Sequence, residues 1–252
     1  MEPTRFKIIS PTDLDDYRNQ AGDIGDASWP EFMMHDSVAN ENWHELFDRF
    51  SDYQFALFDT EKNCMAAMAN SLPFYWDHPV QDLPEAGWDW VFLKAIADHK
   101  AGVKPNIQSA IQIAIRPDYQ SQGLSAIMVK AMRAIATFKG FENMVAPVRP
   151  NQKSKYPLTG IDDYIQWKNE AGLPFDAWLR VHARLGARIL KPCHEAMIIR
   201  GSRADWETWT GLKFPQSGQY YIPGALNPME MDIEKDDGVY IEPNVWMVHP
   251  VG

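Results

Sequence analysis

The chain has 252 residues, 45% of them apolar and 12% aromatic, enough to bury one sizeable core at the upper size limit of a single domain. The charged fraction of 23% argues against long disorder, and the formal net charge of −10 disfavours nucleic acid as a partner. No signal sequence and no apolar run of roughly 18 residues is visible, so we expect a cytoplasmic protein that does not enter a membrane.

The N-terminal part of the chain predicts one strand and two helices, followed by a hairpin of two further strands. Residues 6–9 form an apolar run typical of a strand, and the polar, proline-containing segment after it suits a helix start. Apolar residues at helical spacing over residues 42–50 predict a second helix. Residues 53–58 and 64–72 are strand-like runs joined by a short polar turn, which indicates an antiparallel hairpin.

The segment 73–108 is rich in Pro, Trp and Asp, and we interpret it as an insertion between core elements. A short helix is expected within it at residues 90–99. Trp76, Trp88 and Trp90 either shape a ligand pocket or pack the insertion against the core.

The middle of the chain predicts a strand at residues 109–115, a helix with one apolar stripe at 123–138 and a buried strand at 143–148. The loop 149–155 that follows contains basic residues, which either contact phosphate or remain solvated. Two helices are then expected, at residues 161–170 and 176–185, and two strands, at 187–190 and 196–200.

The chain changes character after Gly201, where a helix at residues 204–210 is followed by a segment that Gly and Pro punctuate. We therefore expect one domain over residues 1–200 and a C-terminal extension over residues 201–252. Apolar residues in the extension predict that it packs on the domain or on a partner subunit, as in a homodimer. Cys64 and Cys193 lie far apart without metal-ligand spacing, so we expect reduced thiols and no metal site.

A candidate anion site follows the strand at residues 109–115. The sequence from Arg116 to Ser125 runs through a short turn into a helix, and a helix N-terminus presents free N–H groups and a positive dipole end. Gly123 removes a Cβ that would keep a phosphate from the backbone, and Ser125 can add a hydroxyl donor. On the residues alone, the stretch is either such a site or a structural turn.

The stretch Gln120-x-x-Gly123-x-Ser125 resembles the pyrophosphate-binding motif (Q/R)-x-x-G-x-(G/A) of the GNAT N-acetyltransferases, with Ser125 at its last position. A second match lies before residue 187, where Leu185-Gly186 resembles the end of the family signature L-Y-x-x-L-G-F. His182 stands where that signature has Tyr, and Ala187 stands where it has Phe. The order of predicted elements over residues 6–200 also agrees with the family.

The resemblance implies an α+β protein with the GNAT acyl-CoA N-acyltransferase fold, a twisted mixed sheet flanked by helices and splayed around the motif strand. Acetyl-CoA is the implied co-substrate, without a metal. The backbone of the motif strand would polarise the thioester carbonyl, and the loop would hold the pyrophosphate; these cofactor-binding residues are Ile113, Ala114, Ile115, Gln120, Ser121, Gln122, Gly123, Leu124 and Ser125. His182 is the candidate acid, Tyr156 is a second candidate donor, and no residue is assigned as the base.

The implied reaction moves an acetyl or short acyl group from acetyl-CoA to a small-molecule or peptide amine by direct attack. Two alternatives stay open. One is a non-catalytic acyl-CoA-binding or scaffolding protein, which the substitutions at His182 and Ala187 would suit. The other is an enzyme of the same fold that acts on a carrier-protein thioester.

Overall fold

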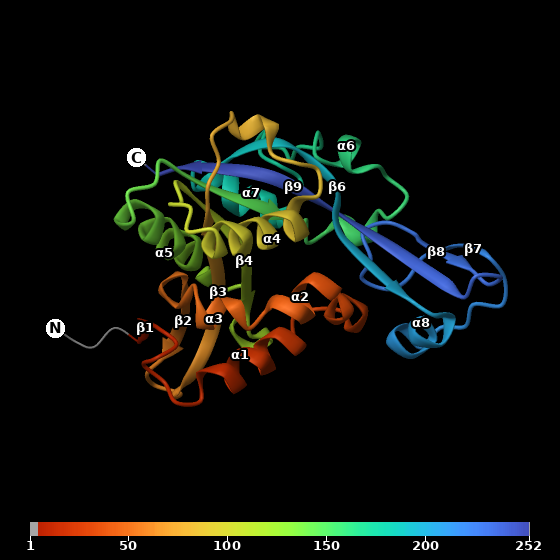
Figure 1. The fold of residues 1–252 in the computed structure, drawn as a ribbon, viewed down its shortest axis with the longest axis horizontal. Coiled ribbons are helices and arrows are strands. Elements are labelled where there is room, and N and C mark those ends of the chain that lie inside the picture. Colours follow the sequence, from red (N-terminus) through yellow and green to blue (C-terminus); the bar gives the residue numbers. More distant parts are fainter. Residues whose placement is uncertain (1–4, 252) are drawn as a thin grey trace.

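A computed structural model describes residues 5–251, and they form one mixed sheet of nine strands flanked by helices (Figure 1). The strand order is β1-β2-β3-β4-β5-β9-β8-β7, and β6 pairs with the opposite edge of β9. The strands are β1 (Phe6–Ile9), β2 (Gln54–Asp59), β3 (Cys64–Phe74), β4 (Ile107–Ile115), β5 (Asn143–Val148), β6 (Arg188–Gly201), β7 (Gly218–Tyr220), β8 (Met229–Asp232) and β9 (Asp237–Pro250). Within the described residues, only β4 and β5 pair in parallel.

The helices are α1 (Tyr17–Asp26), α2 (Ser37–Asn42), α3 (Glu45–Asp48), α4 (Gly87–Lys100), α5 (Leu124–Phe138), α6 (Ile161–Tyr164), α7 (Ala177–Arg184) and α8 (Arg203–Thr210). Helix α1 packs on β3, α4 packs on β3 and β6, and α5 packs on β3 and β4. Among residues 5–251, no helix has both the length and the apolar character that crossing a bilayer requires.

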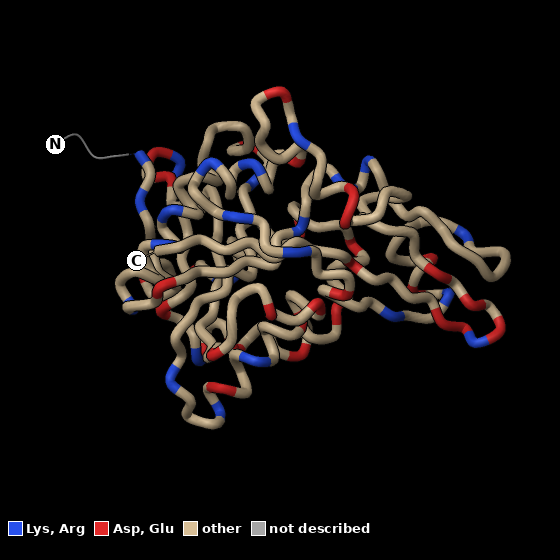
Figure 2. Tube along the Cα trace, turned by 90° about the horizontal axis from the view of Figure 1, so that it is seen from above, with Lys and Arg blue, Asp and Glu red and all other residues tan. Residues whose placement is uncertain are grey.

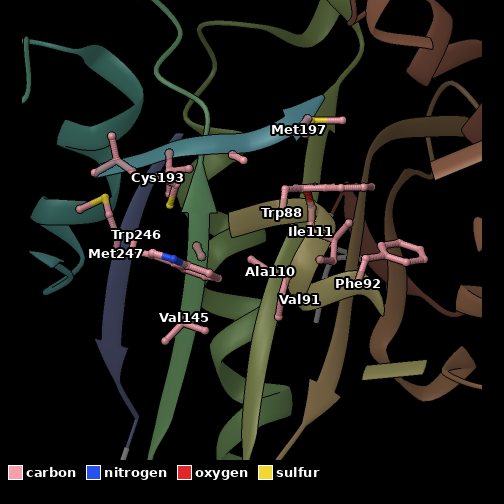
Figure 3. Close-up of a cluster of buried hydrophobic side chains, with 14 of the residues drawn as sticks. Trp88, Val91, Phe92, Ala110, Ile111, Val145, Cys193, Met197, Trp246 and Met247 are labelled. Atoms are coloured by element: carbon pink, nitrogen blue, oxygen red, sulfur yellow. The ribbon is translucent and has the colours of Figure 1, made fainter. Parts of the chain in front are cut away.

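The main core lies where the insertion meets the centre of the sheet. Trp88, Ile111, Val145 and Trp246 belong to one buried apolar cluster there (Figure 3). The indole Nε1 of Trp88 donates a hydrogen bond to the Ile111 carbonyl oxygen at 2.9 Å, and Nε1 of Trp246 donates to the Pro84 carbonyl oxygen at 2.8 Å. Both indoles thus bury apolar area while their single donor is satisfied. The insertion is thereby fixed to both β4 and β9.

The first half of the chain follows the sequence-based expectation in its strands and departs from it in its helices. Strands β1 and β5 coincide with the predicted ranges 6–9 and 143–148. The single helix expected at residues 42–50 is wrong, because the structure has α2 and α3 there. The Asp36 side chain accepts a hydrogen bond from the Ala39 N–H and so starts a helix before residue 42.

The second half departs more. The helix expected at residues 161–170 is shorter, since α6 ends at Tyr164 and a bridge between Lys168 and Pro174 follows. The strands expected at 187–190 and 196–200 are one strand, β6, whose register shifts between Cys193 and Met197. The strand beside β5 is β9, from the segment after Gly201 in which no strand was predicted.

Strands β6 and β9 continue beyond the centre of the sheet as an arm that also contains β7, β8 and α8 (Figure 1). Acidic positions gather at the tip of this arm (Figure 2). The tip contains Glu230, Asp232, Glu234, Asp236 and Asp237. The negative net charge is therefore partly concentrated far from the core.

Replacing Trp246 with Ala is expected to lower the free energy of unfolding by about 3–5 kcal/mol, because it opens a cavity in the core and leaves the Pro84 carbonyl without its donor. Urea denaturation followed by circular dichroism measures the change. Phe138→Ala is the control, because that side chain is 86% exposed and its loss should change stability by less than about 0.5 kcal/mol. Equal urea midpoints for Trp246→Ala and the wild type would contradict the role given to Trp246.

Candidate functional site

The parallel strands β4 and β5 are hydrogen-bonded over a very short length and then separate. Their register contains only the pairs Gln108 with Met144 and Ser109 with Val145. Beyond these pairs a cleft of about 1040 Å³ opens, lined by residues of both strands, of α1 and of α7. The sheet therefore has a gap beside β4, although β4 is paired to β3 from Ile107 to Ile115 with one register shift, between Asn70 and Ser71.

The backbone of β4 presents N–H groups to this gap. The Arg116 N–H donates to the Ala66 carbonyl oxygen at 3.0 Å, continuing the ladder between β4 and β3. In an antiparallel pair, alternate residues direct their N–H groups to the partner strand. The N–H groups of Ile113 and Ile115, which are out of phase with Arg116, therefore point away from β3 and toward the gap.

The loop after β4 forms an open cradle of N–H groups. Ser121 and Gly123 have positive φ angles of 62° and 77°, a geometry that turns successive N–H groups to one side. Among the described residues, no backbone carbonyl accepts from the N–H groups of residues 121–125, and the first such bond of α5 comes from Ala126. These donors and the dipole of the 15-residue helix α5 suit a pyrophosphate.

The cradle opens to the same cleft. Gln120, Ser121 and Ser125 line it, together with the predicted β4 residues Ile113, Ala114 and Ile115. Three predicted residues are not among those that line it, namely Gln122, Gly123 and Leu124. Leu124 is buried in the core, and the Gln122 side chain donates to the Asp118 carbonyl oxygen.

A buried carboxylate holds the start of this loop in place. The hydroxyl of Tyr119 donates to Asp59 Oδ2 at 2.8 Å, and Nη2 of Arg5 donates to the same oxygen at 2.7 Å. Asp59 Oδ1 accepts from the N–H groups of Glu61 and Lys62. Hydrogen bonding from Arg5, above all, keeps the Asp59 pKa well below its ordinary value. The hairpin turn and the loop therefore share one anchor.

His182 lies in the wall of the cleft and is paired with a second histidine. Its Nδ1 is 2.8 Å from Nε2 of His249, and the side chain is 2% exposed. Burial lowers the pKa of His182 to about 3, with a further contribution from His249. Burial and the Arg133 charge lower the pKa of His249 to about 4. Both imidazoles are therefore neutral at pH 7.

Tyr156 is placed elsewhere. Its ring packs edge-on against Trp167 and Phe175, and it is not among the residues that line the cleft.

The basic residues of the loop 149–155 make mostly internal contacts. Lys153 is buried, where its Nζ donates to the carbonyl oxygens of Tyr156 and Leu226, and burial lowers its pKa to about 8. Arg149 is paired with the buried Glu242.

Several cleft residues carry no signal in the sequence. Of the three tryptophans in the insertion, only Trp88 lines the cleft; Trp178 of α7 lines it too, and three further aromatic side chains come from the segment between β1 and β2. These are Trp29, Trp43 and Phe47. Asn244 lines the cleft from β9, far along the chain from the motif, and β9 also supplies His249, the partner of the cleft residue His182. Within residues 5–251, no cluster of three His, Cys, Asp or Glu residues is placed to hold a metal ion.

No protein-family model matches the chain. It is 32% identical over 249 residues to the arginine N-acetyltransferase avaD of Aspergillus versicolor, covering 88% of this chain and 85% of that protein. The fold is similar to the loading GNATL domain of CurA from Lyngbya majuscula, with a TM-score of 0.64, 20% identity and 98% of each chain covered. It is also similar to the GphF GNAT-like decarboxylase solved with isobutyryl-CoA, with a TM-score of 0.52, 16% identity and 99% and 100% of the two chains covered.

Replacing Gly123 with Val is expected to weaken acetyl-CoA binding at least about tenfold, as measured by calorimetry. A β-branched residue strains the positive φ and places methyl groups in the open space before the free N–H groups. Gly102→Val is a matched control, because Gly102 also has a positive φ, of 67°, and open space around its Cβ position. Equal loss of affinity in both variants would show that backbone strain alone is responsible.

The two buried histidines predict a loss of stability in acid. Their pKa values in the folded state lie below the ordinary value of 6.5, so the unfolded chain binds more protons between about pH 4 and 6.5. Stability therefore falls as the pH drops through this window, by up to about 1.4 kcal/mol per pH unit for each histidine. Urea midpoints at pH 7 and pH 5 measure this. His249→Gln should flatten the dependence, exposed His78→Gln should not, and equal slopes in all three proteins would contradict the assignment.

Proposed function

This chain belongs to the GNAT N-acetyltransferase superfamily and transfers an acyl group from coenzyme A to an amine, and from this premise we propose that its acceptor is arginine or another guanidine-bearing amine. The observation that carries the proposal is the 32% identity with an arginine N-acetyltransferase over 88% of the chain. The aromatic side chains of the cleft support it, because guanidinium groups stack on aromatic faces. The net charge of −10 attracts such a cation.

Acetyl-CoA fits the cleft. The free N–H groups of residues 121–125 would hold the pyrophosphate, and the gap between β4 and β5 leads from this cradle along β4. The bound cofactor supplies a thioester, whose carbonyl the N–H groups of Ile113 and Ile115 would polarise. The amine nitrogen forms a bond to the acyl carbon, the carbon–sulfur bond breaks, and the proton lost by the nitrogen ends on the departing sulfur.

His182 acts in this proposal as a neutral hydrogen-bond donor and not as an imidazolium acid. Arg133 donates to the carbonyl oxygens of Leu185 and Pro250, and its Nε has no partner among the described residues. The Arg133 charge lowers the pKa of His249, and we assign the single proton of neutral His249 to Nε2, the nitrogen that faces His182. That proton is donated to His182 Nδ1. His182 Nε2 then carries the other proton and can stabilise charge on the reacting thioester.

We also propose a cytoplasmic location, with acyl-CoA and a small-molecule or peptide amine as partners, a second copy of the chain in a homodimer, and neither nucleic acid nor membrane. The negative net charge supports the exclusion of nucleic acid, whose binding requires clustered Lys and Arg.

Incubating the protein with acetyl-CoA and L-arginine is expected to release free thiol and to yield acetylarginine, detected by a thiol reagent and by mass spectrometry. Phenethylamine is the comparison acceptor and should react more slowly. His182→Phe should lower kcat at least about tenfold without changing the KM for acetyl-CoA, because it removes one donor but keeps the ring volume. The exposed His78→Phe is the matched control.

The outcomes separate the two levels of the proposal. Thiol release with phenethylamine but not with arginine would contradict the acceptor alone. A His182→Phe variant with the kcat of the wild type would contradict the role of His182.

A further inference from the structure

Three side-chain amide oxygens in the wall of the cleft have no hydrogen-bond partner within the described part of the chain. They are Oδ1 of Asn70, Oε1 of Gln112 and Oδ1 of Asn244. The three side chains are only 1%, 9% and 2% exposed. A buried carbonyl oxygen without a hydrogen-bond donor lowers the stability of the protein, because it has lost its contact with water. A ligand that brings N–H or O–H donors to this wall removes that penalty, which favours its binding.

The structure fixes which atom Asn70 presents. Its Nδ2 donates to Gln54 Oε1 at 3.0 Å, which commits the nitrogen side of the amide. Gln54 is itself fixed, because its Nε2 donates to the carbonyl oxygens of Phe50 and Ser71, at 2.8 Å each. Turning either amide by 180° would place two donors or two acceptors opposite each other. The hydrogen bonds of Gln54 therefore determine the orientation of the Asn70 amide, and Oδ1 is the atom left without a donor.

Gln112 lies directly opposite Asn70 across the pair of strands β3 and β4. Residues opposite each other in an antiparallel pair point their side chains to the same face, with Cβ atoms roughly 5 Å apart. The Gln112 side chain makes no hydrogen bond to any described residue, so a ligand is free to orient it. Its neighbour Ile113 directs its N–H into the gap where the thioester would lie.

We propose that Asn70 and Gln112 form the subsite that holds the nucleophilic nitrogen of the acceptor, through hydrogen bonds from its N–H groups to their side-chain oxygens. The inference rests on the proposed transfer to an amine, but not on arginine as the particular acceptor. It names the chemical class as a primary amine or a guanidine, which offers at least two N–H donors to the two oxygens.

The chemistry of the pair explains why amides serve here. A carboxylate would strongly favour the protonated ammonium, which cannot attack, whereas uncharged amides hold the nitrogen and favour its charged form much less. A thiol offers one weak donor and would leave a buried amide oxygen without a partner. The subsite therefore selects nitrogen acceptors over the thiol of a carrier protein.

Calorimetric titration of the protein in complex with coenzyme A tests the subsite, with L-arginine, agmatine and phenethylamine as probes. Gln112→Met keeps the length of the side chain and breaks no internal hydrogen bond. It should raise the Kd of every amine that binds at least tenfold and leave the Kd of acetyl-CoA within about twofold. Gln112→Glu restores the oxygens and should recover amine binding.

The control is Gln108→Met. Gln108 is a buried glutamine on the same strand whose Oε1 also has no partner among the described residues, but it does not line the cleft. Its Nε2 donates to Ser71 Oγ and to the Met132 carbonyl oxygen, so this variant disturbs the strand more than Gln112→Met and makes the control stringent. This variant should bind amines as the wild type does. Unchanged amine affinity in Gln112→Met, or an equal loss in Gln108→Met, would overturn the subsite.

The proposed function can fail separately from the subsite. If the wild type binds no acetyl-CoA, the proposed function fails. If it binds acetyl-CoA but none of the three amines, the subsite is overturned while the cofactor site stands.

Discussion

The early separation of β4 from β5 is the constraint on which the rest of the site depends. Two parallel strands that stayed paired would satisfy each other's N–H and C=O groups and leave no room between them. Because the register stops at Ser109 and Val145, the N–H groups of Ile113 and Ile115 stay available, and α5 begins at the edge of an open cleft. The cofactor cradle, the histidine pair and the amide oxygens all face a gap that exists for this reason.

The gap is kept open by packing, since an unpaired strand edge would otherwise find a partner. Trp88 ties the insertion to the Ile111 carbonyl of β4, and Trp246 ties β9 to the Pro84 carbonyl just before α4. The two tryptophans thus brace the strands on either side of the cleft against the same helix. Residues 73–108 are thereby part of the scaffold that holds the gap.

The sequence predicts those parts of the site that are contiguous in the chain. The stretch from Arg116 to Ser125 contains a strand end, a turn and a helix start, so local rules and the family motif both find it. Glu242, Asn244 and His249 could not be found in this way, because they gain their neighbours only when β9 enters the sheet. His182 was located by its motif, but its neutral state depends on burial and on the partner from β9.

The position of β9 between β5 and β6 also has a consequence for biosynthesis. Residues 1–200 leave the ribosome with both of these strands lacking the neighbour that pairs with them in the finished sheet. Apolar strand edges exposed in this way are prone to associate with other nascent chains. The centre of the sheet can close only after residues 237–250 have been synthesised, so chaperones that shield the unpaired strand edges are expected to aid folding.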